Sequence, residues 1–194
     1  MPRLCFHYST MNAGKSTALL QAAHNYRERG HAVLVYTAAV DIRGGGRVHS
    51  RIGIDAPARA YTAVTDFAAD ARATLATGGL SCILVDEAQF LSESQVRGLG
   101  HIVDDLGIAV LCYGLRTDFR GRLFPGSAAL LAWADDLVEL RTICHCGAHA
   151  TMVVRVDASG AVEREGAQVE IGGNERYVPL CRRHFVEAHA SGHV

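Results

Sequence analysis

The sequence has almost no net charge: its 194 residues include 19 Lys and Arg against 20 Asp and Glu, a formal net charge of −1 at pH 7. This balance excludes the broad positive surface that binds long nucleic acids, although a local basic patch is still possible. No apolar stretch is long enough to span a bilayer. The first ten residues, MPRLCFHYST, lack the apolar core and cleavage site of a signal peptide. We therefore expect a cytoplasmic protein that binds neither a membrane nor a nucleic-acid polymer.

Internal repeats and low-complexity tracts are also missing, and the length fits one domain with a small appendage. Strand-like apolar runs occur at 3–9, 32–38, 82–87 and 108–114, and helical patterns occur at 15–29, 66–77 and 92–107. Strands that alternate with helices predict an α/β fold, in which a parallel sheet carries helices on both faces.

The alternation is lost near Asp135, and the chain beyond it has the pattern of short strands and turns. Residues 158–177 are polar and rich in glycine, with little apolar surface to bury. We therefore predict two domains, 1–140 and 141–194. An earlier segment, 41–57, has three consecutive glycines and no periodicity, which predicts a mobile loop. This loop is either a linker or a second lid, and its arginines could contact phosphate: Arg43, Arg47 and Arg51.

The stretch YSTMNAGKS at 8–16 has the features of a phosphate-binding loop, in which Lys and Ser open a helix after a strand and a turn. Lys15 can reach the β- and γ-phosphates of a nucleotide, and the Ser16 hydroxyl can bind Mg²⁺. Backbone N–H groups would surround the phosphates along the turn formed by Ser9, Thr10, Met11, Asn12, Ala13 and Gly14. Ser9 replaces the usual first glycine and would be strained if that position needs a positive φ. The alternative is a chance Gly-Lys-Ser at a helix start.

Two acids, Asp86 and Glu87, end the predicted strand at 82–87. An aspartate at this place in nucleotide-hydrolysing proteins holds Mg²⁺, and the following glutamate could accept a proton from an attacking hydroxyl. Ala88 and Gln89 continue the same loop and are assigned to the nucleotide site. A solvated acidic pair is the alternative, but the strand end and the phosphate loop should meet at one edge of the sheet.

The six cysteines fall into two groups and show no disulfide framework. Three lie in apolar, strand-like runs and are assigned to the core: Cys5, Cys82 and Cys112. The others form, with one histidine, a candidate structural zinc site: Cys144, Cys146, Cys181 and His184. His145 is a competing ligand. Unrelated thiols or a cysteine nucleophile are alternatives, although the spacing favours a metal.

Five segments in this order resemble the cytosolic, zinc-containing thymidine kinases of bacteria and animals. They are STMNAGKST, VDEAQF, YGLRTDFRG, CHC and VEIGGNERYVPLCRRH. The resemblance spans about residues 3 to 189, and IGGNERY followed by C-x-x-H is more specific than the phosphate loop. Ser9 departs from the commonest family pattern, and so does His184, where many members have cysteine. Both departures keep the functions that the pattern requires.

The resemblance implies a P-loop NTPase-like fold and transfer of the γ-phosphoryl group of ATP to thymidine, and also to deoxyuridine, in nucleotide salvage. Glu87 would be the general base, and Ser16 and Asp86 would hold Mg²⁺. Residues 141–194 would carry zinc and a lasso-like lid, in which 148–176 close over thymidine. The implied nucleoside pocket consists of Met11, Phe90, Leu115, Phe119 and Tyr177, although Phe90 and Leu115 could instead be core. A homotetramer and feedback inhibition by dTTP are also implied.

Two other functions are compatible with parts of the sequence. A P-loop ATPase with a zinc ribbon would hydrolyse ATP under stimulation by DNA or a protein partner, but the low net charge disfavours it. A sensor that binds dTTP without turnover would have no need for a base at Glu87.

Overall fold

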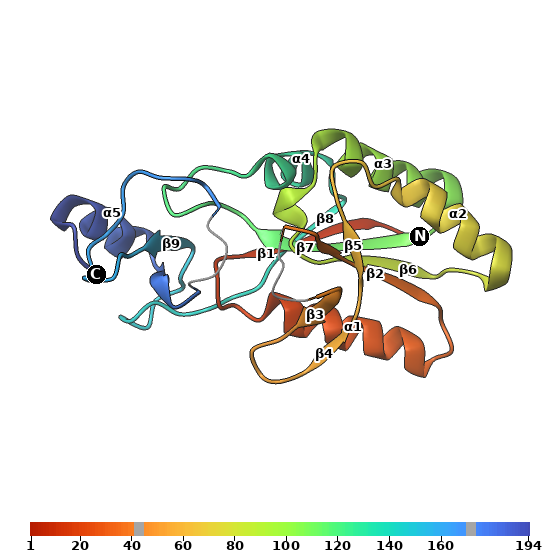
Figure 1. Cartoon of the computed structure of the whole chain (residues 1–194), viewed down its shortest axis with the longest axis horizontal. Coiled ribbons are helices and arrows are strands. Elements are labelled where there is room, and N and C mark those ends of the chain that lie inside the picture. The colour runs from red at the N-terminus through yellow and green to blue at the C-terminus, as the bar shows by residue number, and fades with distance from the viewer. Residues whose placement is uncertain (41–44, 170–173) are drawn as a thin grey trace.

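The computed structural model describes residues 1–40, 45–169 and 174–194. A six-stranded sheet forms its centre, with the strand order β5-β2-β6-β7-β1-β8 and parallel pairing throughout (Figure 1). The strands are β1 (Leu4–Ser9), β2 (Val33–Ala38), β5 (Arg59–Tyr61), β6 (Cys82–Val85), β7 (Ala109–Leu115) and β8 (Asp136–Glu139). The predicted α/β fold is confirmed, and the four predicted strands end within two residues of the observed bounds.

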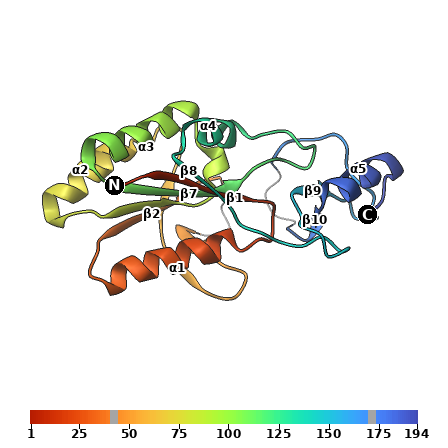
Figure 2. The ribbon, with the colours of Figure 1, turned by 180° about the vertical axis from the view of Figure 1, so that it is seen from behind.

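Helices cover both faces of this sheet, as predicted. They are α1 (Lys15–Glu28) on one face and α2 (Phe67–Gly78), α3 (Glu93–Leu106) and α4 (Pro125–Trp133) on the other (Figures 1 and 2). Each face has its own apolar core. The helix starts follow local chemistry: Asp66 accepts hydrogen bonds from the first turn of α2, and Ser92 and Gln95 form a capping box at α3. The pattern did not predict α4, because PGSAALLAW is apolar almost throughout and has no polar face.

The prediction of a mobile loop at 41–57 is wrong for its second half. β3 (Arg47–His49) and β4 (Asp55–Pro57) form an antiparallel hairpin. The predicted loop begins with residues 41–44, which include Arg43 and lie outside the described residues. Val48 is buried against the core of α1, and the Ser50 hydroxyl contacts that of Thr17 in the same helix. Strands of three residues are too short to show periodicity, so only packing reveals them.

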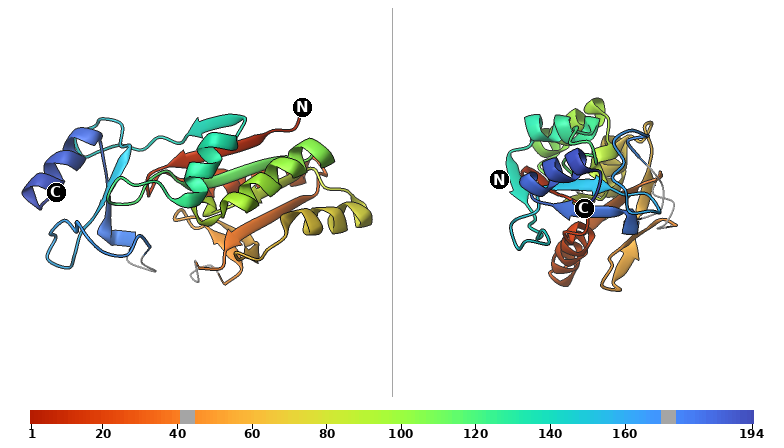
Figure 3. Two further views of the ribbon diagram at one scale, coloured as in Figure 1. Left: turned by 90° about the horizontal axis from the view of Figure 1, so that it is seen from above. Right: turned by 90° about the vertical axis from the view of Figure 1, so that its left-hand side faces the viewer.

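The chain after β8 forms a second, smaller unit beyond one end of the sheet (Figure 3). Its elements are β9 (Met152–Arg155), the short η3 turn (Asn174–Arg176), β10 (Tyr177–Leu180) and α5 (Arg182–Ser191). β9 and β10 pair antiparallel, and a separate apolar cluster lies between them and α5. None of the helices formed by the described residues combines the length and apolar character that crossing a membrane requires.

The cysteines assigned to the core have two different environments. Cys82 and Cys112 are fully buried, as predicted. The prediction for Cys5 is wrong, because this side chain is only partly buried. It lies beside the edge strand β8, with its Sγ 3.7 Å from a carboxylate oxygen of the solvent-exposed Asp136. Its exposure reflects its place beside the edge of the sheet, which the local sequence does not show.

Candidate active site

The phosphate loop connects β1 to α1 at the carboxyl edge of the sheet. Its left-handed positions are Asn12, with φ of 67°, and Gly14, with φ of 78°. Ser9 is the last residue of β1 and has no positive φ, so the strain considered for a serine at this position does not arise. Its Oγ instead donates a hydrogen bond to the Leu140 carbonyl, 2.5 Å away. Serine therefore fastens the loop to the chain that leaves β8.

Lys15 and Ser16, at the start of α1, face the acids at the end of β6. The Lys15 ammonium donates to the Thr10 carbonyl at 2.6 Å, so it folds back over the loop. Burial lowers the pKa of Lys15, while Glu87 and Asp86 oppose that shift. The Ser16 Oγ donates to Asp86 at 3.0 Å. A hydroxyl and a carboxylate this close form the oxygen donor set that Mg²⁺ prefers.

Asp86 is 5% exposed, and its environment penalises its charge. Burial raises its pKa to about 7, with a further contribution from neighbouring Glu87, while the hydrogen bond from Ser16 and the charge of Lys15 act in the opposite direction. A buried carboxylate of this kind is stabilised by a nearby cation. The site therefore combines a negative pair with positions where positive charge would be favourable.

Glu87 follows Asp86 in a left-handed backbone conformation, with φ of 53°. Such a conformation is uncommon for a residue with a side chain and costs of order 1–3 kcal/mol, and strained residues of this kind cluster at functional sites. Gln89 in the η2 turn (Ala88–Phe90) donates to the Glu87 carboxylate at 2.5 Å, and its own carbonyl accepts from the Leu115 backbone at 3.0 Å. The Tyr61 hydroxyl donates to the Glu87 carbonyl at 2.8 Å. Gln89 therefore holds the carboxylate of Glu87, and Tyr61 holds its backbone.

Two glycines leave room for the η2 turn. A Cβ at Gly114 would lie 3.0 Å from both the backbone nitrogen and the side-chain oxygen of Gln89. A Cβ at Gly126, in the first turn of α4, would lie 2.6 Å from the Ala88 carbonyl and 2.7 Å from that of Leu91. The two oxygens that face Gly126 belong to the backbone, so no side-chain rotation can move them away. The close packing of α4 on the η2 turn therefore fixes the position of the segment that carries Glu87 and Gln89.

Gly126→Ala should destabilise the protein by about 1–3 kcal/mol and lower its turnover, because the added methyl group must displace the η2 turn. Thermal unfolding and steady-state kinetics measure the two effects. Gly100→Ala is the matched control: it lies in α3 with open space around its Cβ position, so alanine should be neutral or stabilising. Equal melting temperatures for the Gly126 variant and the parent would contradict this packing argument.

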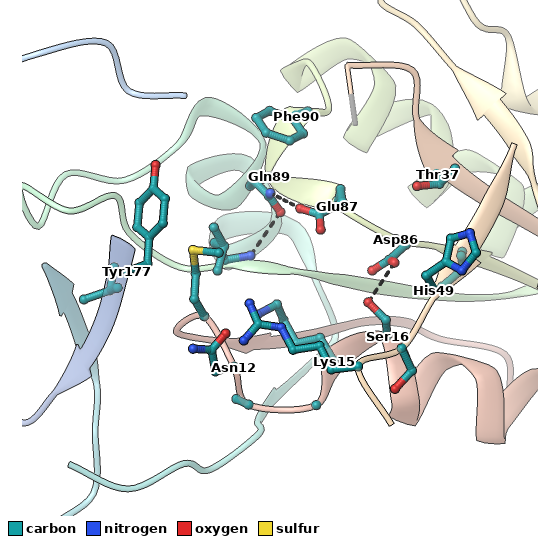
Figure 4. A pocket seen from close by; sticks show the side chains of 18 of the residues that line it. Asn12, Lys15, Ser16, Thr37, His49, Asp86, Glu87, Gln89, Phe90 and Tyr177 are labelled. Atoms are coloured by element: carbon teal, nitrogen blue, oxygen red, sulfur yellow. Dashed lines mark hydrogen bonds between the residues drawn. The ribbon is translucent and has the colours of Figure 1, made fainter. Parts of the chain in front are cut away.

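These groups line one cavity of about 530 Å³. This volume is within the size range of small-molecule sites. In Figure 4, Asp86 and Ser16 lie on one side of this cavity, Tyr177 lies on the other, and Lys15 and Glu87 lie between them. The predicted site residues that line it are Met11, Asn12, Ala13, Gly14, Lys15, Ser16, Asp86, Glu87, Gln89, Phe90, Leu115, Phe119 and Tyr177. The other three are buried and do not line it: Ser9, Thr10 and Ala88.

Phe119 is the predicted pocket residue with the most unexpected environment. It lies among polar residues in the sequence, yet it is only 1% exposed. The smaller unit encloses it, because the Arg155 guanidinium lies 4.0 Å from the ring centre and His189 Nε2 lies 3.1 Å from the Phe119 carbonyl oxygen. Phe90 packs against the main core and also lines the cavity, which is compatible with both interpretations of this residue.

Several cavity residues were not predicted from the sequence. They are Thr17, Thr37, Val40, Val48, His49, Ser50, Ile52, Thr117, Asp118, Phe124, Val153, Gln168 and Val169. Arg47 and Arg51, which the sequence suggested as possible phosphate contacts, also line the cavity. Residues 47–52 of the β3–β4 hairpin all line the cavity. The three arginines of the glycine-rich segment were the available signal there. Arg47 pairs with Asp55 at the cavity wall, and Arg51 is close enough to lower the pKa of Lys15.

The four predicted zinc ligands meet in the smaller unit, with all their ligand atoms within 4.8 Å of one another. His184 Nδ1 lies 3.3 Å from the sulfur of Cys144 and 3.4 Å from that of Cys181, and the sulfurs of Cys146 and Cys181 are 4.0 Å apart. A tetrahedral zinc ion with ordinary bond lengths would separate nitrogen and sulfur by about 3.5 Å and two sulfurs by about 3.8 Å. The cluster therefore has the dimensions of a closed zinc site.

The thiol chemistry of this cluster also suits a metal. Burial raises the pKa of Cys144, but hydrogen bonds from the backbone at Cys146 and Cys181 and from His184 outweigh it and lower the pKa to about 6. The thiolate is the form that binds zinc. His145 is exposed and lies outside this four-residue cluster, although its ring centre is 4.3 Å from that of His184.

Comparison with known proteins assigns this architecture to one family. The family model described as thymidine kinase matches residues 2–185. A thymidine kinase of Jannaschia sp. (strain CCS1) is 59% identical over 189 residues, which cover 97% of both chains. The thymidine kinase of Ruegeria pomeroyi is 61% identical over 97% of this chain and 96% of its own length. That of Salmonella typhimurium is 56% identical over 99% of this chain and 94% of its own length.

Proposed function

The chain belongs to the thymidine kinase family, and we propose that it transfers the γ-phosphoryl group of ATP to the 5′-hydroxyl of thymidine. Deoxyuridine is a second acceptor, and the reaction serves nucleotide salvage. The observation that carries the proposal is the single cavity in which the phosphate loop, the two acids and a group of aromatic side chains meet. Phosphoryl transfer requires chiefly that donor and acceptor be aligned and that charge be stabilised, which such a cavity provides.

Each end of the cavity has a distinct task in this proposal. Backbone N–H groups of the loop and the Lys15 ammonium bind the phosphates, for which Lys15 leaves the Thr10 carbonyl. Glu87 accepts the proton of the 5′-hydroxyl, and Gln89 holds its carboxylate in place. Ser16 and Asp86 would hold Mg²⁺, which supplies charge neutralisation at the phosphates when bound.

We assign the acceptor to the other end of the cavity. Met11, Phe90, Leu115, Phe119 and Tyr177 form its walls, and residues 148–176 act as the lid that excludes water. Residues 1–140 and 141–194 act as two domains, one for ATP and one that closes on the nucleoside. A structural Zn²⁺ at Cys144, Cys146, Cys181 and His184 fastens the second domain.

We also propose that dTTP inhibits by occupying the acceptor site and that the chain forms a homotetramer. Competition between dTTP and thymidine in steady-state kinetics tests the first statement. Molar mass by light scattering tests the second. The shape of the site supports the proposal for dTTP, because one ligand would carry both the base and the phosphates that the two ends of the cavity are proposed to accept.

ADP release in the presence of Mg²⁺ and a panel of nucleosides tests the main proposal. Thymidine should raise ATP turnover strongly, deoxyuridine should follow, and purine nucleosides should leave turnover at its basal value. An ATPase with a zinc ribbon would show the reverse pattern, with stimulation by DNA and indifference to thymidine.

A further inference from the structure

Phe119 and Tyr177 come from distant parts of the chain, yet one side chain contacts both. Arg155 ends β9, and its side chain is only 4% exposed. Its guanidinium carbon lies 4.0 Å from the centre of the Phe119 ring. Tyr177 is its direct partner in the β9–β10 pair, and the two side chains interact. Arg155 itself does not line the cavity, so it stands behind two of the residues that do.

The same guanidinium holds the chain between 163 and 167. Its Nε donates to the Glu163 carboxylate, and its Nη1 donates to the Ala167 carbonyl at 3.0 Å. Gly166 passes so close that a Cβ there would lie 2.6 Å from Arg155 Nη2. The next residue after this segment, Gln168, lines the cavity and donates to Asp118 at 3.2 Å. The segment is thus tied at both ends to the neighbourhood of Phe119.

Arginine has the shape that this arrangement requires. A planar guanidinium can stack one face on an aromatic ring while its edge donates to a carboxylate and a carbonyl at once, and a lysine cannot do both. A buried cation is stable only where its partners remain in place. Displacing Phe119, Glu163 or Ala167 therefore disturbs the others through Arg155.

We propose that Arg155 is a positioning residue for the nucleoside, which fixes Phe119, Tyr177 and residues 163–167 as one unit at the acceptor end of the cavity. The inference rests on the proposed function and assigns binding of the nucleoside and binding of ATP to different groups of residues. Arg155 controls the apparent affinity for the nucleoside, while the phosphate loop and the two acids control ATP binding and proton transfer.

Arg155→Met should raise the KM for thymidine about tenfold to a hundredfold, because the stacking and the charged hydrogen bonds are lost together. The KM for ATP should change by less than about twofold, since the phosphate loop is untouched. Arg155→Lys keeps the charge but not the planar fork, and should fall close to the Met variant. Arg97→Met is the matched control: this exposed arginine of α3 pairs with Glu93 and does not line the cavity, so both KM values should stay at the parent level.

A merely structural role for Arg155 would lower the melting temperature and change all kinetic constants together. The distinguishing readout is a double-mutant cycle with Phe119→Leu. If Arg155 acts through Phe119, the Arg155→Lys effect on thymidine KM should largely disappear in the Phe119→Leu background. Equal thymidine KM for the Lys variant and the parent, or fully additive effects in the cycle, would overturn the inference. The Lys variant carries the test if the Met variant does not fold.

The failure of this inference and the failure of the proposed function give different results. A parent protein that phosphorylates no nucleoside overturns the proposed function. Calorimetric titration with thymidine then tests Arg155 by binding alone: weaker binding to the Lys variant than to the parent supports it, and equal binding or no binding to the parent overturns it. An active parent together with an unchanged Lys variant overturns only the role of Arg155.

Discussion

Glu87→Gln should lower kcat by about 10²- to 10⁴-fold, with much smaller changes in both KM values, because it removes the proposed proton acceptor while keeping the shape of the side chain. The carboxylate faces the cavity beside Gln89, and the strained backbone at Glu87 holds it there. Glutamine can fill the same space without taking a proton from the 5′-hydroxyl. Steady-state kinetics at saturating ATP and thymidine give the kcat ratio.

Glu28→Gln is the control for this substitution. Glu28 is exposed at the end of α1, and its carboxylate lies 3.3 Å from His24 Nε2 in the same helix, so activity should stay at the parent level. The base assignment is wrong if the Glu87 variant keeps kcat within about threefold of the parent, since a lost general base costs more than that. A rise in KM alone would indicate that Glu87 binds the nucleoside and does not carry the proton.

Cys144→Ser should abolish zinc binding at the proposed site and unfold much of the smaller unit. Structural zinc contributes about 10–16 kcal/mol of apparent binding free energy in small domains. The apolar cluster between β9, β10 and α5 is small, and Cys144 is itself one of its buried members. Loss of the unit would also expose Phe119, which Arg155 and His189 enclose. Activity should therefore disappear together with the metal.

Metal analysis and amide hydrogen exchange measure these effects separately. The variant should lose its zinc and the exchange protection of β9, β10 and α5, while the large sheet stays protected. Two controls should keep both: Cys5→Ser, far from the cluster in β1, and His145→Ala, beside it. Retention of zinc by Cys144→Ser, or its loss from His145→Ala, would show that the ligand set is wrong.

The sequence predicted the four central strands of the main sheet, because their signals are local, but it did not predict the edge strands β5 and β8. Each buried strand is an apolar run bounded by turns, and each predicted helix has either an amphipathic pattern or a capping residue such as Asp66 or Ser92. The same is true of the cysteine and histidine cluster, whose members occur as two close pairs. Where packing decides the structure, the prediction failed: three-residue strands at 47–57 and the apolar helix α4 have no periodic signal.

The candidate site likewise has a part that the sequence predicted and a part that it did not. Motif spacing was enough to bring Lys15, Ser16, Asp86 and Glu87 into one cavity. It could not show that Ser9 bonds to Leu140, since those residues are 131 positions apart, or that Arg155 lies over Phe119. Contacts of this kind depend on how the two ends of the chain meet, and no short pattern records them. The unpredicted cavity residues of the β3–β4 hairpin have the same origin.

Transfer of label from γ-labelled ATP to thymidine tests the central claim most directly. With Mg²⁺ and thymidine, the protein should form dTMP and ADP in equal amounts. The label should be found in the 5′-phosphate of dTMP, and ADP should be unlabelled. DNA added in place of thymidine should leave ATP turnover at its basal value. Labelled inorganic phosphate as the only labelled product, released faster when DNA is present, would contradict the account.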